Sequence, residues 1–338
     1  MKNIHSFSFL IIIIYLISAV NPAFSEDIAQ ITEQLPAQLD SKYGFSLGFQ
    51  KGIVYGQAFE LVYPSNTKGK YLSELTWDMK PVFYAGLEAD FNRVDLMSKP
   101  GFFAHAAFKL GIPGDTGVME NRDWMSYKNG NLTHFSSHTN KTKEYYWADI
   151  MIGASIPVKN IFYIKPFLSG SWMHFSFSGR DGYRTYARPN GSGDYFSIDD
   201  DPVYGVFSGE VIRYKQDWLL AAAGFSFGSN KQLPFLFEFF FSISPFTYCV
   251  GIDQHLDPSK IITFADYSFW GLYIEPKIKI GYTKNNIGFL FEAAYRYIGD
   301  TRGLSYIDIG NTGYFYQDGN AGAGLSLFDI RLIVKYTF

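Results

Sequence analysis

Two pairs of polar residues in this sequence could activate a water molecule for hydrolysis. Asp253 and His255 lie two positions apart, and so do Asn121 and Asp123. Side chains two apart on a β-strand share a face, so each pair would present both groups to the same space. A carboxylate beside an imidazole fixes the ring tautomer and stabilises its charged form, which makes His255 a candidate general base. On pattern alone, Asp-x-His at a strand end is also typical of a solvated rim contact.

These pairs need a scaffold with defined faces, and the sequence indicates β-strands. From Phe328 to Phe338, apolar side chains occupy every second position and largely polar ones lie between them. A helix would scatter the charged residues around its axis, whereas a strand separates them onto one face. The segment 287–297 alternates in the same way. We expect ten strands, near residues 43–63, 71–91, 101–124, 141–157, 161–185, 203–228, 233–255, 261–283, 286–302 and 321–338.

The composition excludes several classes of protein. The chain has 338 residues, a formal charge of −3, 47% hydrophobic residues and 19% aromatic residues. It is therefore too apolar to be disordered, and it lacks the basic balance of a nucleic-acid-binding protein. The single cysteine, Cys249, excludes an intramolecular disulfide and a multi-cysteine metal site, and no paired-histidine zinc spacing occurs. We expect no metal and no cofactor.

The first residues indicate export. Residues 1–25 have the features of a secretory signal, in which Lys2 precedes the apolar run 9–17 and small residues mark the cleavage site. No later run approaches the roughly 18 consecutive apolar residues that a spanning helix needs. The mature chain is then either soluble outside the cytoplasm or a membrane barrel. We expect a short periplasmic segment at 26–42 and a single barrel domain at 43–338.

Three features favour an all-β, ten-stranded antiparallel transmembrane barrel over a soluble sandwich. The apolar faces are heavily aromatic, the chain ends on an aromatic residue, and short and long connections alternate. Short periplasmic turns are expected at 158–160, 228–233 and 283–286, and long outer loops at 125–140, 186–202 and 303–320.

The expected strands are taller than a membrane requires. Twenty residues at ~45° tilt rise roughly 47 Å, against an apolar band of ~25 Å, so the barrel should project above the outer membrane. The third and seventh strands both end on the outside and lie four steps apart in a ring of ten. The pair Asn121 and Asp123 should therefore nearly face the pair Asp253 and His255 across the mouth.

Several motifs occur in an order and spacing that resemble one known family. They are 59–63 (Phe-Glu-Leu-Val-Tyr), 73–77 (Ser-Glu-Leu-Thr-Trp), 117–125 (Gly-Val-Met-Glu-Asn-Arg-Asp-Trp-Met), 213–216 (Arg-Tyr-Lys-Gln), 253–258 (Asp-Gln-His-Leu-Asp-Pro) and 335–338 (Lys-Tyr-Thr-Phe). From about Phe45 to Phe338 the chain resembles the omptins, which are outer-membrane aspartyl-type endopeptidases with ten-stranded barrels.

The resemblance implies a mechanism in which water attacks the peptide carbonyl. An Asp–His dyad and a facing pair of aspartates hold that water in the family. Carried over, Asp253 and His255 are the dyad and Asp123 is one facing acid, while Asn121 stands where the family has aspartate. An amide can hydrogen-bond the water but can neither accept its proton nor add negative charge.

The resemblance also implies substrate and partners. Glu60 matches one acid of a pocket for basic side chains, and Gly251 stands at the position of the other, which predicts a weaker preference for arginine or lysine. The family's Ser-x-His-Pro loop is matched loosely by the segment 136–138. The implied partners are peptides or proteins and outer-membrane lipid, including lipopolysaccharide, and a monomer is expected. The alternative is a non-catalytic barrel acting as an adhesin, a binding protein or a porin.

Overall fold

The computed structural model describes residues 43–338, apart from 65–70, 94–99, 127–129, 159–161, 193, 230–234 and 258–259. The expected signal at 1–25 and periplasmic segment at 26–42 lie outside the described residues. Within them, no helix is long and apolar enough to cross a membrane.

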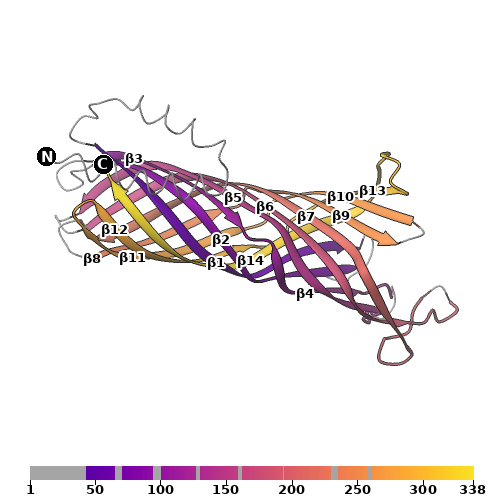
Figure 1. Ribbon diagram of the computed structural model, residues 1–338. Coiled ribbons are helices and arrows are strands. Elements are labelled where there is room, and N and C mark those ends of the chain that lie inside the picture. The colour runs from indigo at the N-terminus through magenta and orange to yellow at the C-terminus, as the bar shows by residue number, and fades with distance from the viewer. Residues whose placement is uncertain are drawn as a thin grey trace.

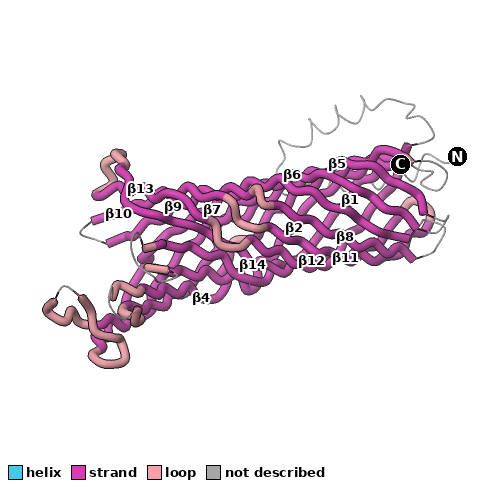
Figure 2. The backbone as a smooth tube through the Cα atoms, turned by 180° about the vertical axis from the view of Figure 1, so that it is seen from behind, coloured by secondary structure: helices cyan, strands magenta, loops and turns pink. Residues whose placement is uncertain are grey.

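The described residues form one tall, closed, antiparallel β-barrel (Figures 1 and 2). The segments are β1 (Tyr43–Tyr63), β2 (Ser73–Arg93), β3 (Gly101–Gly111), β4 (Gly114–Asp123), β5 (His134–Val158), β6 (Phe162–Ala187), β7 (Pro202–Ser229), β8 (Phe235–Ser244), β9 (Thr247–Asp257), β10 (Lys260–Phe269), β11 (Tyr273–Lys284), β12 (Ile287–Ile298), β13 (Arg302–Ile309) and β14 (Tyr316–Thr337). Pairing of β1 with β14 closes the barrel.

The ring contains ten strands, as the alternation predicted, because four strands are each interrupted once. β3 continues as β4, β8 as β9, β10 as β11 and β12 as β13. Near the chain's C-terminus the ring runs through β3, β8, β11 and β12, and at the opposite end it runs through β4, β9, β10 and β13. We call these the inner end and the outer end.

Three of the interruptions lie on consecutive strands at matching positions. Below them Ser244 pairs with Tyr273, and above them Tyr248 pairs with Phe269. At the gap, Thr247 Oγ1 accepts a hydrogen bond from the Gly271 amide at 2.7 Å, so a side chain replaces the missing ladder bond. The outer wall can therefore change direction without leaving this buried amide unpaired.

The outside of the inner part is apolar, as expected for a barrel in a membrane. Exposed apolar side chains there include Tyr55, Phe83, Leu87, Ile150, Leu168, Leu219, Phe289, Phe328 and Leu332. Above this belt, outward positions of β7 carry charge, as at Arg213 and Lys215. The outer ends of the strands therefore stand in water.

Two of the expected long loops are shorter than predicted because the strands extend further. β5 begins at His134 rather than 141, β13 reaches Ile309 and β14 begins at Tyr316. These extensions lie above the apolar belt, where neither face must meet lipid. They therefore lack the regular apolar alternation that predicted the rest of each strand.

The middle of the lumen is filled by buried ionic groups. Asp329 accepts hydrogen bonds from Lys109 at 2.5 Å and from Arg296 at 2.8 Å. Arg296 also pairs with Glu275 and lies 4.0 Å from the centre of the Trp147 ring. Side chains fill the barrel at this level, which we call the ionic plug.

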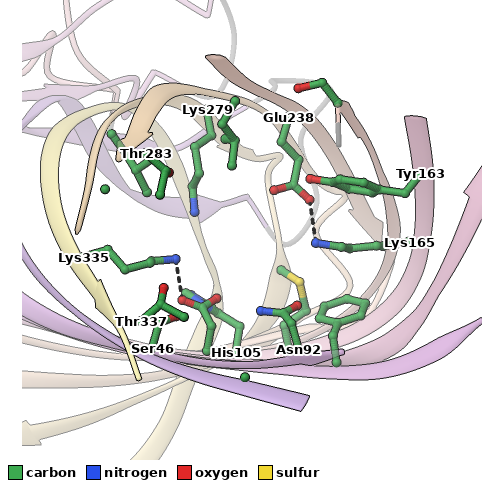
Figure 3. A pocket seen from close by; sticks show the side chains of 18 of the residues that line it. Ser46, Asn92, His105, Tyr163, Lys165, Glu238, Lys279, Thr283, Lys335 and Thr337 are labelled. Atoms are coloured by element: carbon green, nitrogen blue, oxygen red, sulfur yellow. Dashed lines mark hydrogen bonds and ion pairs between the residues drawn. The ribbon is translucent and has the colours of Figure 1, made fainter. Parts of the chain in front are cut away.

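A polar cavity of about 390 Å³ lies below the ionic plug, at the inner end (Figure 3). Lysines point into it from several strands, and each has an acidic partner. Lys165 lies 3.2 Å from Glu238, and Lys335 lies 2.6 Å from Asp90. The lysine charges are thus neutralised within the wall.

An aromatic layer separates the ionic plug from the outer mouth. Trp77 stacks between Phe177 and Tyr214, with ring centres 5.5 and 5.4 Å apart. Gln216 Nε2 donates a hydrogen bond across the lumen to the Phe59 carbonyl at 2.8 Å. This layer lies directly below the residues of the outer mouth.

Candidate active site

The acid–base pair lies near the outer end of β9. His255 Nε2 lies 2.7 Å from Asp253 Oδ2. Asp253 is 2% exposed, whereas the His255 side chain is 45% exposed. The negative charge of Asp253 raises the pKa of His255 against the opposing effect of burial. Because this contact engages Nε2, proton exchange with a ligand in the mouth would use Nδ1.

The facing wall is built by β4 and its neighbour β2. Asp123 pairs with Ser73, and Asn121 pairs with Leu75. Ser73 Oγ donates a hydrogen bond to Asp123 Oδ1 at 2.6 Å, and Asn121 Nδ2 donates one to Asp123 Oδ2 at 3.2 Å. Burial raises the pKa of Asp123, and these two donors partly offset that rise.

The two walls act on each other electrostatically. The Asp123 charge helps to raise the pKa of His255, and the His255 charge helps to lower the pKa of Asp123. β4 and β9 are the outer halves of the third and seventh strands, four steps apart in the ring. The structure therefore brings Asn121, Asp123, Asp253 and His255 to one mouth.

A serine–histidine pair flanks the mouth on β5. His138 Nε2 lies 3.0 Å from Ser136 Oγ, and His138 Nδ1 lies 2.6 Å from the Asp181 carbonyl. The carbonyl can only accept, so Nδ1 carries the proton and Nε2 accepts from the serine. Burial lowers the pKa of His138, and the His255 charge lowers it further. His138 is thus held neutral while His255 readily takes up a proton.

The two expected pocket positions lie deeper, close to Asp253. Glu60 on β1 is 3% exposed. Burial raises the pKa of Glu60, as do the charges of Asp253 and Asp266. Gly251 faces Gln216 on β7 and Asp266 on β10. Glu60 and Gly251 were expected from the sequence, whereas Asp266 was not, because no motif marks it.

Ser73 was not expected as a site residue, although it is the first residue of the motif at 73–77. Ser73 begins β2 directly beside Asp123 at the end of β4. This contact follows only from the register of the two strands, so the sequence alone could not show it. Among the described residues, no group of three or more His, Cys, Asp or Glu side chains could hold a metal ion.

Comparison with known proteins identifies the family. The model of the omptin family matches residues 41–338. Among solved structures, the outer membrane protease OmpT from Escherichia coli superposes with a TM-score of 0.74 at 22% identity, covering 89% of this chain and 99% of that chain. The toluene transporter TodX from Pseudomonas putida gives a TM-score of only 0.26 at 9% identity, covering 88% of this chain and 90% of that one. A search of curated proteins finds no match. The chain is an outer-membrane β-barrel and belongs to the omptin family.

Proposed function

We propose that the chain is an endopeptidase that hydrolyses extracellular peptides or proteins with a water molecule held at the outer mouth. The observation that carries the proposal is the contact between Asp253 and His255, together with the electrostatic coupling of His255 to Asp123. A buried carboxylate, a partly exposed imidazole and a second carboxylate on the opposite wall are the groups that water activation requires.

The reaction uses His255 twice. Its Nδ1 takes a proton from water while the water oxygen adds to the carbonyl carbon of the substrate. Asp253 stabilises the imidazolium that forms. The carbon–nitrogen bond then breaks as the imidazolium returns the proton to the leaving amine, so one water is consumed and the dyad is regenerated.

Asp123 and Asn121 orient the water from the other side. Asp123 accepts a hydrogen bond from the water and adds negative charge that favours the imidazolium. The Asn121 amide donates to Asp123, as a protonated aspartic acid would, so the pair carries one negative charge. Asn121 therefore replaces an aspartate of the family pattern, while His255 remains as the general base.

The test is incubation of refolded protein with a peptide library, followed by mass spectrometry of the products. His255→Ala should lower turnover by about 10²–10⁴-fold. His174→Ala is the matched control, because His174 contacts Asp217 and Glu144 outside this mouth. Heat-modifiable gel mobility checks folding of each variant. Equal cleavage by His255→Ala would refute the peptidase and leave a binding barrel.

A further inference from the structure

The outer part of β7 rises above the strand that pairs with it at the mouth. Pairing with β9 begins at Ile212, opposite His255, and continues inward to Leu220. On its other side β7 stays paired with β6 as far as Pro202. No described strand pairs with residues 202–211 on the β9 side, and the hairpin of β6 and β7 stands apart from that of β9 and β10 at the outer end (Figure 1). We call residues 202–211 of β7 the free edge.

Backbone groups along the free edge point alternately toward β6 and away from it. Ala187 on β6 donates its amide to the Thr133 carbonyl, on the β5 side, at 2.7 Å. Counting by two from Ala187, every other β6 residue turns its backbone groups toward β5, so those between them face β7 and one of these meets Gly205. The N–H and C=O groups of Tyr204 and Val206 are therefore directed away from β6, into the free edge.

The free edge carries little of the protection that exposed strand edges normally have. Lysines, prolines or a covering loop usually prevent an edge from pairing with another chain. Here the stretch contains no lysine, and Pro202 lies at its outer tip. Val206 is 86% exposed and Tyr204 is 74% exposed. The loop after β6 lies on the β5 side, where the Ile198 amide donates to the Leu132 carbonyl at 3.1 Å. The described residues thus leave the edge uncovered.

The free edge leads into the mouth. Val206 lies about six residues above Ile212, which is about 20 Å of extended chain. Ile212 is the residue of β7 that pairs with His255. Phe207 turns to the lumen side, where its ring lies 4.9 Å from the centre of the His138 ring. An extended peptide along the edge would therefore continue the line of β9 and could reach the dyad with residues about six positions away.

A second copy of this chain fits the free edge poorly. Two copies in one membrane have their outer ends on the same side, so a two-fold axis along the membrane normal would relate them. Such an axis brings identical groups of the two edges to the same height, with donor beside donor and acceptor beside acceptor. A peptide is free of this restriction because its direction and register can adapt to the edge.

We propose that the free edge of β7 binds an extended segment of the substrate as an added β-strand, through the backbone groups of Tyr204 and Val206. The proposal rests on the proposed peptidase function, since it names the part of the substrate that is held outside the mouth. Main-chain recognition depends little on sequence, whereas the side chains of Tyr204 and Val206 favour a β-branched or aromatic residue opposite them. The substrate class is therefore a flexible segment of a polypeptide that can become extended.

The test measures affinity, so that it does not depend on cleavage. A fluorescent peptide of about 16 residues, long enough to span the free edge and the dyad, is titrated with His255→Ala in detergent and followed by anisotropy. N-methylation of the peptide, one residue at a time, should weaken binding about tenfold at every second residue of the segment on the edge, and hardly between them. Absence of this period of two overturns the proposal.

A pair of variants at one position tests the protein side. Val206→Pro, made in His255→Ala, removes an amide from the free edge and leaves the ladder to β6, so binding should weaken about tenfold. Val206→Thr keeps the amide and the shape of the side chain, and it should bind several-fold more tightly than Val206→Pro. Equal affinities for the proline and threonine variants overturn the proposal.

Hydrogen exchange separates failure of the free edge from failure of the peptidase. The peptide should slow exchange of the Tyr204 and Val206 amides in His255→Ala by at least about tenfold. Slowed exchange supports the edge even if the native protein cleaves nothing. Rapid cleavage by the native protein with unchanged exchange at both amides overturns the edge and leaves the peptidase intact. A dimer that Val206→Pro dissociates in sedimentation, without a change in peptide affinity, also overturns the proposal.

Discussion

Replacement of Asn121 by aspartate is the sharpest test of the role proposed for Asn121 and Asp123 in water activation. It adds a carboxyl group with little change in shape. Asn121 Nδ2 lies 3.2 Å from Asp123 Oδ2. Two carboxylate charges at that separation repel by about 5 kcal/mol at an effective dielectric constant of about 20. Protonating an ordinary carboxylate at pH 7 costs about 4 kcal/mol. The pair therefore keeps one proton at neutral pH, and the acid hydroxyl takes the place of the Asn121 amide as donor.

Asn121→Asp should consequently leave kcat within about threefold of the native value near pH 6. At about pH 9 the second proton leaves, and the added charge favours the imidazolium that forms at His255 during water attack. We expect kcat to rise there relative to the native protein. The assay is a full pH profile of kcat and KM with one quenched peptide.

The control is Asn190→Asp, which adds the same charge in an exposed outer loop where Asn190 accepts a hydrogen bond from Ser192. Its profile should follow that of the native protein. Superimposable profiles for Asn121→Asp and the native protein from about pH 5 to pH 9 would show that position 121 does not act on the reacting water.

Three further outcomes are expected. Ser73→Ala removes the donor at 2.6 Å from Asp123, so the pKa of Asp123 rises and the acid limb of the pH–rate profile moves to higher pH; an unmoved limb would contradict the role of Ser73. Burial raises the pKa of Asp266 to about 7, so the native state binds more protons than the unfolded state and loses stability as pH rises from about 4 to 7. Asp266→Asn should thus leave stability unchanged at pH 4 and raise it by up to about 4 kcal/mol at pH 8, as measured by urea unfolding in detergent; equal effects at both pH values would refute this. Lys109→Met leaves the buried Asp329 with one cation fewer and should cost about 3–5 kcal/mol by the same assay, and a neutral effect would show that the remaining arginine contacts suffice.

The ten strands and their order could be predicted from the sequence, because lipid on one side and a packed lumen on the other impose alternation. The interruptions could not, although Pro113 and Pro245 mark two of them. Their stability depends on contacts such as Thr247 with the Gly271 amide, between residues 24 positions apart. No local pattern encodes that pairing.

The contact between Asp253 and His255 was predictable because the two residues lie two positions apart on one strand. The position of Asp266 opposite Gly251 was not predictable. It is set by the register of β9 against β10, and that register depends on the whole barrel. The family resemblance pointed to Glu60, but only the closed ring shows that Glu60 and Asp266 act on each other.

The ionic plug determines from which end of the barrel a molecule can reach the outer mouth. Lys109, Arg296 and Asp329 close the cylinder between the outer mouth and the inner cavity. In the proposed peptidase, a peptide can therefore reach Asp253 and His255 from the outer mouth only, and its fragments must leave through the same mouth. Hydrolysis by the proposed peptidase would thus require no open path through the barrel.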